Sequence, residues 1–245
     1  MVSGKYSALS GAVAREQALD NIAANLANVN SSGFKKNKVS FEAILRGTRQ
    51  VGEAGGLNYS RIRTIGTNFD QGGLQETGRD LDLAINGEGF FKIQAGAETL
   101  YSRAGHFKLD ENGMIKTPEG YQLLGAGNQP LQLLEAQGKQ ISIDDNGLVS
   151  IDGVDAGVRF QVFTVADQSQ LKPAGQSRFR LAPEAASQAK EEFRLVQGSL
   201  ETSNVNMMEE MALMINTQRK FEAHLKALEN YSRLSDKQDE LGSLG

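Results

Sequence analysis

Apolar residues recur at helical spacing at both ends of the chain. From about residue 3 to residue 30 they return every three or four positions, as in Leu19, Ile22 and Leu26, with no Pro in the segment. From about 205 to 240 the chain has neither Pro nor Gly. Steps of four and three there form a heptad pattern, typical of coiled coils, over Met207, Met211, Met214, Gln218, Phe221, Leu225 and Leu228. Two long amphipathic helices are therefore predicted, which pair with each other or with other subunits.

Local residues predict where these helices end. Gly33, after two serines, suits a left-handed C-terminal cap of the first helix. Ser203 or Asn204 suits the N-cap of the last helix. Glu209 and Glu210 suit its first turn, because the helix dipole favours negative charge there.

Between about 70 and 200, short apolar runs alternate with Gly, Asn and Asp, which is typical of strands and tight turns. The sequences Asp110–Gly113 and Asp144–Gly147 predict two similar β-hairpins, each with Gly where a positive φ is needed. Further strands are predicted at 158–165 and 179–181.

The expected fold class is α+β, with long N- and C-terminal helices paired as a coiled coil and a central, mostly antiparallel β-domain. The Gly-rich stretch before this β-domain has no strong period and is interpreted as an extended connector with room for one strand. The predicted divisions are a terminal-helix domain at 1–45 and 200–245, a connector at 46–76 and a β-domain at 77–199.

Composition excludes several classes of protein. The 245 residues contain no Cys, which excludes disulfides, thiol catalysis and cysteine-ligated metals. Two histidines, His106 and His224, are too few for a histidine-rich metal centre. A net charge of -4 argues against a nucleic-acid module. No stretch resembles a cleavable signal peptide or a membrane-spanning helix, which by itself predicts a cytoplasmic protein unless export uses an uncleaved signal.

Candidate catalytic and binding patterns are weak. The two Asp-rich turns lack the ligand spacing of a calcium loop. Gly87-Glu88-Gly89 precedes a strand-like run instead of a helix, so we interpret it as a turn and not a phosphate loop. Ser102, His106 and Asp110 are close in sequence, but a catalytic triad is defined by geometry. The basic run at 35–38 is interpreted as solvated surface. We expect no catalytic residues, cofactor or metal.

Two patterns on the predicted helices point to interfaces. Asn21, Asn25 and Asn28 share one face of the first helix, which favours amide hydrogen bonds across a helix interface over an ordinary polar face. The cluster of Met207, Met208, Met211 and Met214 has core spacing. Alternatively, it forms a surface that adapts to several different neighbours.

Five segments resemble those of bacterial flagellar rod and hook proteins. The N-terminal signature is similar to NIAANLANVNSSGFK at 21–35, and the C-terminal signature to GSLETSNVN at 198–206 with MINTQRKFE at 214–222. TGRDLDLAINGEGFF at 77–91 and YSRAGHF at 101–107 resemble the family's central segment. The resemblance covers nearly the whole chain in the family's order. A chain of 245 residues with one β-domain is similar to both the proximal and the distal rod proteins. The resemblance is closer to a proximal rod protein at the first eleven residues, at residues 219–222 and in the short connector.

This resemblance implies a structural, non-enzymatic subunit of the flagellar rod, the drive shaft that crosses the periplasm. It implies export through the flagellar type III apparatus without signal cleavage, and partners that are other rod subunits and copies of itself, with no nucleic acid and no membrane insertion. The expected assembly contacts are Leu19, Ile22, Asn25, Leu26, Asn28, Met211, Met214, Phe221, Leu225 and Leu228. The alternatives are a distal rod or hook-type protein, and a ligand-binding or enzymatic β-domain with helical oligomerisation arms.

Overall fold

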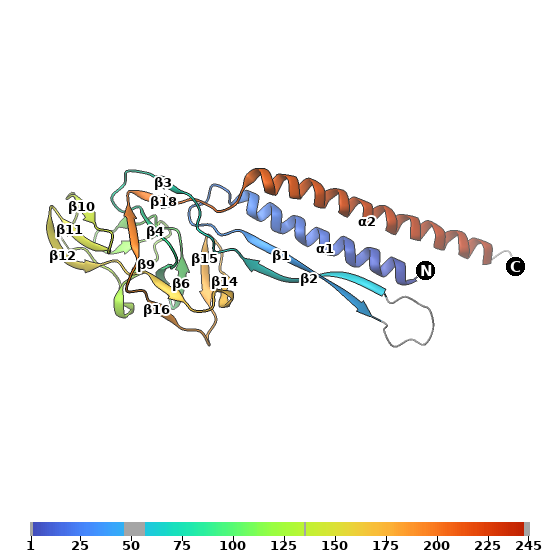
Figure 1. The fold of residues 1–245 in the computed structure, drawn as a ribbon, viewed down its shortest axis with the longest axis horizontal. Helices are drawn as coiled ribbons and strands as arrows, with labels where there is room; N and C mark the ends of the chain where they lie inside the picture. Colours follow the sequence, from blue (N-terminus) through green and yellow to red (C-terminus); the bar gives the residue numbers. More distant parts are fainter. Residues whose placement is uncertain (1, 47–56, 135, 243–245) are drawn as a thin grey trace. The chain divides into compact units, whose positions relative to one another are not determined.

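The computed structural model describes residues 2–46, 57–134 and 136–242. Its two helices, α1 (Val2–Ala27) and α2 (Met207–Gly242), begin and end the described chain, and strands lie between them in the sequence (Figure 1). The chain forms two compact units. The first contains both helices with β1 (Asn37–Arg46) and β2 (Leu57–Thr67), and the second contains residues 28–36 and Phe69–Val205.

In the first unit, α1 and α2 lie side by side and run in opposite directions, as Figure 1 shows. The two predicted terminal helices are thus confirmed as helices. Beside them, β1 and β2 form an antiparallel hairpin, from Asn37 opposite Thr67 to Arg46 opposite Leu57. The sequence placed the start of this hairpin in the helical domain and its return strand in the connector. Residues 47–56 of that predicted connector lie outside the described residues.

The second unit is built from short strands that all pair antiparallel, as predicted for the middle of the chain. Its largest sheet has seven strands in the order β14-β15-β6-β5-β9-β8-β7. Three strands form a second sheet in the order β10-β11-β12, and three pairs are β13-β16, β17-β4 and β18-β3. The strands are β3 (Leu74–Glu76), β4 (Leu83–Asn86), β5 (Phe91–Ala95), β6 (Glu98–Ser102), β7 (Lys108–Leu109), β8 (Ile115–Lys116), β9 (Gln122–Leu124), β10 (Ile141–Ile143), β11 (Leu148–Ile151), β12 (Val154–Arg159), β13 (Phe163–Val165), β14 (Leu171–Pro173), β15 (Arg178–Leu181), β16 (Ser187–Ala189), β17 (Arg194–Gln197) and β18 (Ser199–Glu201).

The two predicted hairpin turns are confirmed, and they share one geometry. The Oδ1 of Asp110 accepts the N–H groups of Asn112 and Met114 at 2.9 and 2.8 Å. Asp144 makes the same two bonds, to residues 146 and 148, at 3.0 and 2.7 Å. The glycine that follows has a φ of 75° in the first turn and 82° in the second. Each Asp therefore organises its turn by binding backbone amides, and no metal ligand is needed to explain it.

A filled apolar core lies between the sheets of the second unit. Its largest cluster joins the inner faces of β4, β5 and β9 to residues of later segments. Phe91 packs edge-on against Phe107, with the ring centroids 5.1 Å apart. A second cluster surrounds Phe90, Phe163 and Phe179. Burial of these rings supplies much of the stability of a domain made of such short strands.

Element boundaries differ from the predictions at three places. First, α1 ends at Ala27, and Gly33 lies six residues beyond it, so Gly33 is not the helix cap. Second, the cap of α2 is Asn206, whose Oδ1 accepts the N–H of Met208 at 3.0 Å, while Ser203 and Asn204 precede it. Third, the single strand predicted at 158–165 is interrupted at residues 160–162 between β12 and β13.

Gly33 has a different role. Its φ is 66°, and a Cβ at this position would lie 2.2 Å from the backbone nitrogen of Ala104. Both facts require glycine. The chain after α1 is turned instead by Asn28 and Ser31, since the Oγ of Ser31 donates to Asn28 Oδ1 at 3.1 Å and its N–H donates to the Asn28 carbonyl at 3.1 Å.

Candidate assembly surface and buried ion cluster

The ten residues predicted as assembly contacts occupy three kinds of position. Ile22 and Asn25 are buried within the subunit. Met211 and Leu225 are 46% and 44% exposed. The remaining six are half-buried, namely Leu19, Leu26, Asn28, Met214, Phe221 and Leu228.

Asn25 is only 1% exposed, and its amide joins three elements of the first unit. Its Oδ1 accepts the N–H of Asn37, and its Nδ2 donates to the Asn37 carbonyl, both at 2.9 Å. The same Nδ2 donates to Glu210 Oε2 at 3.1 Å. A single amide therefore fixes the end of α1 against the start of β1 and the first turn of α2, which is the cross-helix bonding that the asparagine pattern predicted.

The two helices approach closely, and their contacts repeat every seven residues. A Cβ on Gly4 would lie 2.8 Å from the ring of Tyr231, and one on Gly11 would lie 2.5 Å from the ring of His224. Asn25 meets Glu210. Midway between the last two contacts, Ala18 and Thr217 are both buried. Contacts seven residues apart on α1 therefore pair with contacts seven residues apart on α2, in the reverse order. At each of these contacts the residue on α1 has a small or short side chain.

This register corrects the heptad pattern read from the sequence of α2. Its buried positions are Glu210 and Thr217, and His224 and Tyr231 continue them as half-buried positions that touch glycines of α1. Alternate members of the predicted pattern, Met214, Phe221 and Leu228, are half-buried. The other members are exposed, namely Met207, Met211, Gln218 and Leu225. Size explains the difference, because a Gly- and Ala-rich face admits a partner helix closely at some positions and turns its larger neighbours outward.

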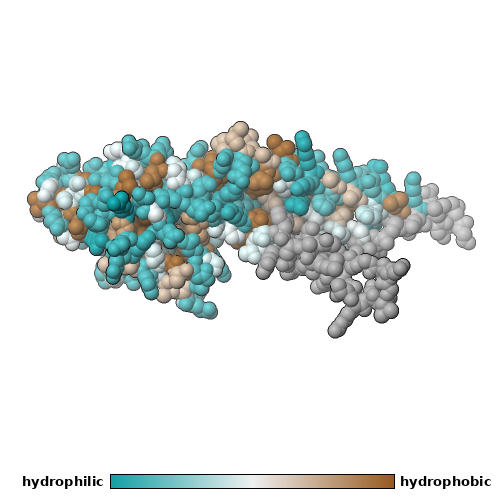
Figure 2. Space-filling model, in the orientation of Figure 1, coloured by the Kyte–Doolittle hydropathy of each residue, from teal (hydrophilic) through white to brown (hydrophobic). Residues whose placement is uncertain are grey.

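Exposed apolar residues are most frequent on the first turns of α2. Met207, Met208, Met211, Leu213 and Ile215 are each more than 40% exposed. In Figure 2, brown apolar surface appears over this part of the helix. A second exposed set, Tyr6, Leu9 and Val13, follows the first half of α1 at helical spacing. We call these two sets together the apolar helix surface. Groups of exposed apolar side chains of this kind mark interaction sites in soluble proteins.

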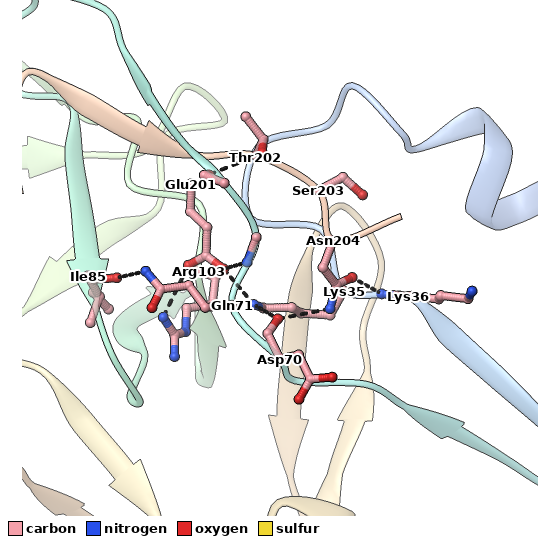
Figure 3. Close-up of polar contacts among 12 residues, drawn as sticks. Lys35, Lys36, Asp70, Gln71, Ile85, Arg103, Glu201, Thr202, Ser203 and Asn204 are labelled. Carbon is pink, nitrogen blue, oxygen red and sulfur yellow. Dashed lines mark hydrogen bonds and ion pairs between the residues drawn. The ribbon is translucent and has the colours of Figure 1, made fainter. Parts of the chain in front are cut away.

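The second unit holds an ion cluster of Lys35, Arg103 and Glu201, all nearly inaccessible to solvent (Figure 3). Lys35 Nζ lies 2.5 Å from Glu201 Oε1, and Arg103 Nη1 lies 3.1 Å from Glu201 Oε2. The N–H of Gly72 also donates to Oε1 at 2.9 Å. One carboxylate therefore serves two buried cations, which leaves the cluster with one net positive charge.

Burial governs the protonation of these cations. It lowers the pKa of Lys35 below its usual 10.5, and the bond and charge of Glu201 oppose that shift. Burial likewise lowers the pKa of Arg103, again opposed by Glu201. Further bonds compensate the lost hydration. Lys35 Nζ donates to the Asp70 carbonyl at 2.7 Å, and Arg103 Nη2 donates to the Gly87 carbonyl at 2.7 Å.

Sequence reasoning missed this cluster. It assigned Lys35 to a solvated basic run, yet the side chain is buried. Glu201 and Arg103 stood inside quoted family segments without an assigned role. The available signal was a charged residue within an otherwise small and neutral signature, Glu201 in GSLETSNVN. A charge in such a setting is usually buried with a partner or functional.

His106 has a structural partner, and Ser102 is hydrogen-bonded elsewhere. Its Nδ1 lies 2.7 Å from Asp82 Oδ1, while Ser102 donates to the Ser177 carbonyl at 3.0 Å and is buried. Desolvation alone would raise the pKa of Asp82. However, hydrogen bonds from Thr77, His106 and Arg79 outweigh it and lower the pKa below the usual 3.8. An open groove of about 810 Å³ runs past His106, lined by segments 78–82, 106–111 and 136–141.

No group of three or more metal-ligating side chains occurs within residues 2–46, 57–134 and 136–242. In the same described ranges, neither helix has a segment long and apolar enough to cross a membrane. The features that remain as candidates for function are the apolar helix surface and the ion cluster.

Comparison with known proteins gives three family models, matched in chain order. Residues 6–35 match "Flagella basal body rod protein", residues 84–151 match "Flagellar hook protein FlgE/F/G D1 domain", and residues 196–241 match "Flagellar basal body rod FlgEFG protein C-terminal". The flagellar basal-body rod protein FlgG of Bacillus subtilis (strain 168) is 35% identical over 252 residues, covering 93% of this chain and 94% of the relative. This chain belongs to the flagellar basal-body rod protein family.

Relatives of both rod types are similar to this rod-family chain. The rod protein FlgF of Caulobacter vibrioides is 32% identical over 241 residues, covering 96% of each chain. FlgG of Borreliella burgdorferi is 32% identical over 254 residues, covering 94% of each. Similarity therefore establishes the family and leaves the FlgF and FlgG types unseparated. Two of the matched segments contain α1 with Lys35 and α2 with Glu201, which are the features described above.

Proposed function

We propose that this chain is a structural subunit of the flagellar basal-body rod and joins copies of itself and other rod subunits through its terminal helices. The observation that carries the proposal is the apolar helix surface, on a chain related to rod proteins along nearly its whole length. An apolar side chain that is exposed in the subunit gains about 1.5–3 kcal/mol when a neighbour buries it. Repeated contacts that do not close into a ring build a helical shaft, which transmits torque with no catalytic step.

Inside the subunit, α1 and α2 pair as an antiparallel coiled coil. The seven-residue register of Gly4, Gly11, Ala18 and Asn25 against α2 supports this pairing. A chain without Cys allows a direct test, because Ala18→Cys with Thr217→Cys introduces the only two thiols. Mild oxidation is expected to crosslink this pair within one chain. The matched control, Ala18→Cys with Gln218→Cys, moves one thiol to an exposed position and should not crosslink. Equal crosslinking of both pairs would contradict the register.

The ten candidate contacts divide by their position in the subunit. Ile22 and Asn25 act indirectly, since they hold the helices and β1 together. Met211 and Leu225 are accessible and make direct contacts with neighbours. The six half-buried residues lie at the border between the two roles.

Leu225→Asp tests assembly without disturbing the subunit. Because Leu225 is 44% exposed, the purified variant should keep its thermal unfolding midpoint, while cells carrying it should lose rod assembly and swimming. Asn230→Asp is the matched control, since it adds the same charge at an exposed polar position of α2 and should leave motility intact. Normal swimming of the Leu225→Asp strain would refute assembly through the exposed apolar residue Leu225 of α2.

Within the rod we assign the chain to the proximal part, as a FlgF-type subunit, on its first eleven residues, residues 219–222 and its short connector. The alternative is a distal rod or hook-type subunit. Labelling the subunit in isolated basal bodies separates the two, because a proximal subunit lies at the end of the rod far from the hook. The proposal includes delivery by the flagellar type III export apparatus to the periplasmic space, without a cleaved signal and without insertion in the membrane.

A filled β-core supports a structural role over a ligand-binding β-domain with helical arms. The core cluster of the second unit is packed with side chains such as Phe91, Phe107 and Phe160. The groove beside His106 is open and lined by charges of both signs, such as Arg79 and Asp80. Ligand pockets are instead concave, mostly apolar and able to bury most of a ligand.

A further inference from the structure

Three segments of the second unit meet at the ion cluster, and each adjoins a point where the chain passes between the two units. Residues 33–36 lead into β1, residues 70–73 follow β2, and residues 201–204 lead toward α2. Segments far apart in the sequence thus gather at one place, as Figure 3 shows for Lys35, Asp70 and Glu201.

The first and last of these segments are bonded directly to each other. Gly33 donates its N–H to the Glu201 carbonyl at 2.8 Å, in addition to the Lys35–Glu201 ion pair. The N–H of Lys36 donates to Asn204 Oδ1 at 2.7 Å. Main-chain and side-chain bonds therefore join a segment that follows α1 to the segment that precedes α2.

The middle segment is bonded to both of the others. The Asp70 carbonyl accepts from Lys35 Nζ at 2.7 Å and from Asn204 Nδ2 at 2.9 Å. The N–H of Thr202 donates to the Gly73 carbonyl at 2.8 Å. A Cβ on Gly72 would lie 2.0 Å from the Thr202 carbonyl oxygen, so the two backbones touch.

We propose that segments 33–36, 70–73 and 201–204 form a clasp, a set of bonds that carries tensile force between them. A force that enters the second unit through one chain crossing passes through these bonds, and through the β18–β3 pair that adjoins them, to another crossing, and the larger sheets are spared. Buried, charge-assisted bonds suit this role because they are strong and do not compete with water. Side-chain bonds link the clasp to the neighbouring strands, such as Arg103 to the Gly87 carbonyl and Gln71 to the Ile85 carbonyl.

The use of such a clasp in a rotating shaft rests on the proposed function. The mechanical property itself does not, because it is measured on the isolated chain. If pulling shows no shortening of the folded-state lifetime while motility is normal, the clasp alone is rejected. A placement outside the rod would reject the function alone.

Single-molecule pulling on the full chain tests the clasp in two geometries. Asn30→Cys with Met208→Cys puts handles on exposed residues that flank the clasp. Val154→Cys with Glu184→Cys puts them on exposed residues of the β-domain, so the load bypasses the clasp. Because the natural chain has no Cys, the handles attach only at these positions. In each geometry the lifetime of the folded state at constant force is measured.

The folded-state lifetime of Lys35→Met is compared with that of Val149→Ala, a change in the core remote from the clasp. The thermal stability of each variant is measured separately, and each lifetime is corrected for the stability that the variant has lost. Across the clasp, Lys35→Met should shorten the lifetime at least about tenfold relative to Val149→Ala, since it removes charge-assisted bonds from the loaded path. Across the β-domain the two should agree. Equal lifetimes across the clasp, or the same deficit in both geometries, would overturn the proposal. Should Lys35→Met not fold, Asn204→Ala, which removes two clasp bonds from a half-buried site, decides by the same criteria.

Discussion

Glu201→Gln is expected to be the most damaging single change of one side chain in the ion cluster. The carboxylate lies 2.5 Å from Lys35 Nζ and 3.1 Å from Arg103 Nη1, and its side chain has no solvent access. Glutamine keeps the size but removes the only negative charge of the cluster. Its net charge then rises from one positive to two, with both cations still buried.

The size of the effect follows from this geometry. Removing one partner of a buried ion pair costs about 3–5 kcal/mol, because an uncompensated charge is left in a medium of low dielectric constant. A domain is usually stable by about 5–15 kcal/mol, so the second unit should lose roughly a fifth of its stability or more. For a unit of this size, the midpoint of thermal unfolding should fall by roughly 10 °C.

Lys35→Met should cost less, although it also removes a charge. Arg103 and Glu201 then remain as a neutral pair, and the Asp70 carbonyl keeps its bond from Asn204 at 2.9 Å. Adding Lys35→Met to Glu201→Gln should restore part of the lost stability, because one unpaired buried cation costs less than two. The expected order of stability is Lys35→Met, then the double variant, then Glu201→Gln.

Hydrogen exchange measured by mass spectrometry on peptides of β4 to β6 is the suitable assay, because it reports the second unit separately from the helices. Glu192→Gln, the same substitution at an exposed site, should change stability by less than about 0.5 kcal/mol. The reasoning is refuted if Glu201→Gln costs no more than this control, or if Lys35→Met makes Glu201→Gln worse.

Two further predictions concern the packing of the helix pair and the stability of the second unit at low pH. Gly11→Leu should destabilise the helix pair by about 1–3 kcal/mol through overpacking against His224, measured from helix unfolding by circular dichroism, and His224→Ala in the same chain should reverse the loss. Val13→Leu, at an exposed position of the same helix, is the control. A Gly11→Leu chain as stable as this control would contradict the close approach of the helices. Asp82→Asn should destabilise the second unit at pH 7. The difference in unfolding free energy from the natural chain should shrink as the pH falls below 3.8, because the lowered pKa of Asp82 gives stability that is present above that value and lost on protonation. A difference that stays constant down to pH 2 would exclude this cause.

Features set by nearby residues were predictable from the sequence. The terminal helices followed from apolar spacing, and the twin turns at Asp110 and Asp144 followed from side chains that bond amides two and four residues ahead. Helix caps were placed less well. Asn206, Asn204 and Ser203 are all capable caps, and the side chain of Asn204 is instead used in tertiary bonds to Lys36 and Asp70.

Features set by distant residues were not predictable. The Lys35–Glu201 pair joins residues 166 positions apart, and no local pattern distinguishes Lys35 from a solvated lysine. The connector was given room for one strand, which agrees with β2, but β1 was not predicted, because residues 37–45 were assigned to the terminal-helix domain. The register of α1 against α2 was missed because apolar periodicity identifies a helix face, whereas glycine and alanine decide how closely a partner approaches.

The division of polar and apolar groups between the inside and the outside of the subunit now supports assembly by apolar contact. Asn25, a strong candidate for a contact between subunits from its place in the family signature, uses both ends of its amide on Asn37 and Glu210 of its own chain. Three methionines of α2 whose spacing resembled a core, Met207, Met208 and Met211, are instead exposed, and Met214 is half-buried. Polar hydrogen bonds such as those of Asn25 thus hold each subunit together, and flexible, apolar Met side chains remain exposed to contact neighbouring subunits. A surface of this kind tolerates partners of slightly different shape, as a shaft made of several related subunits requires.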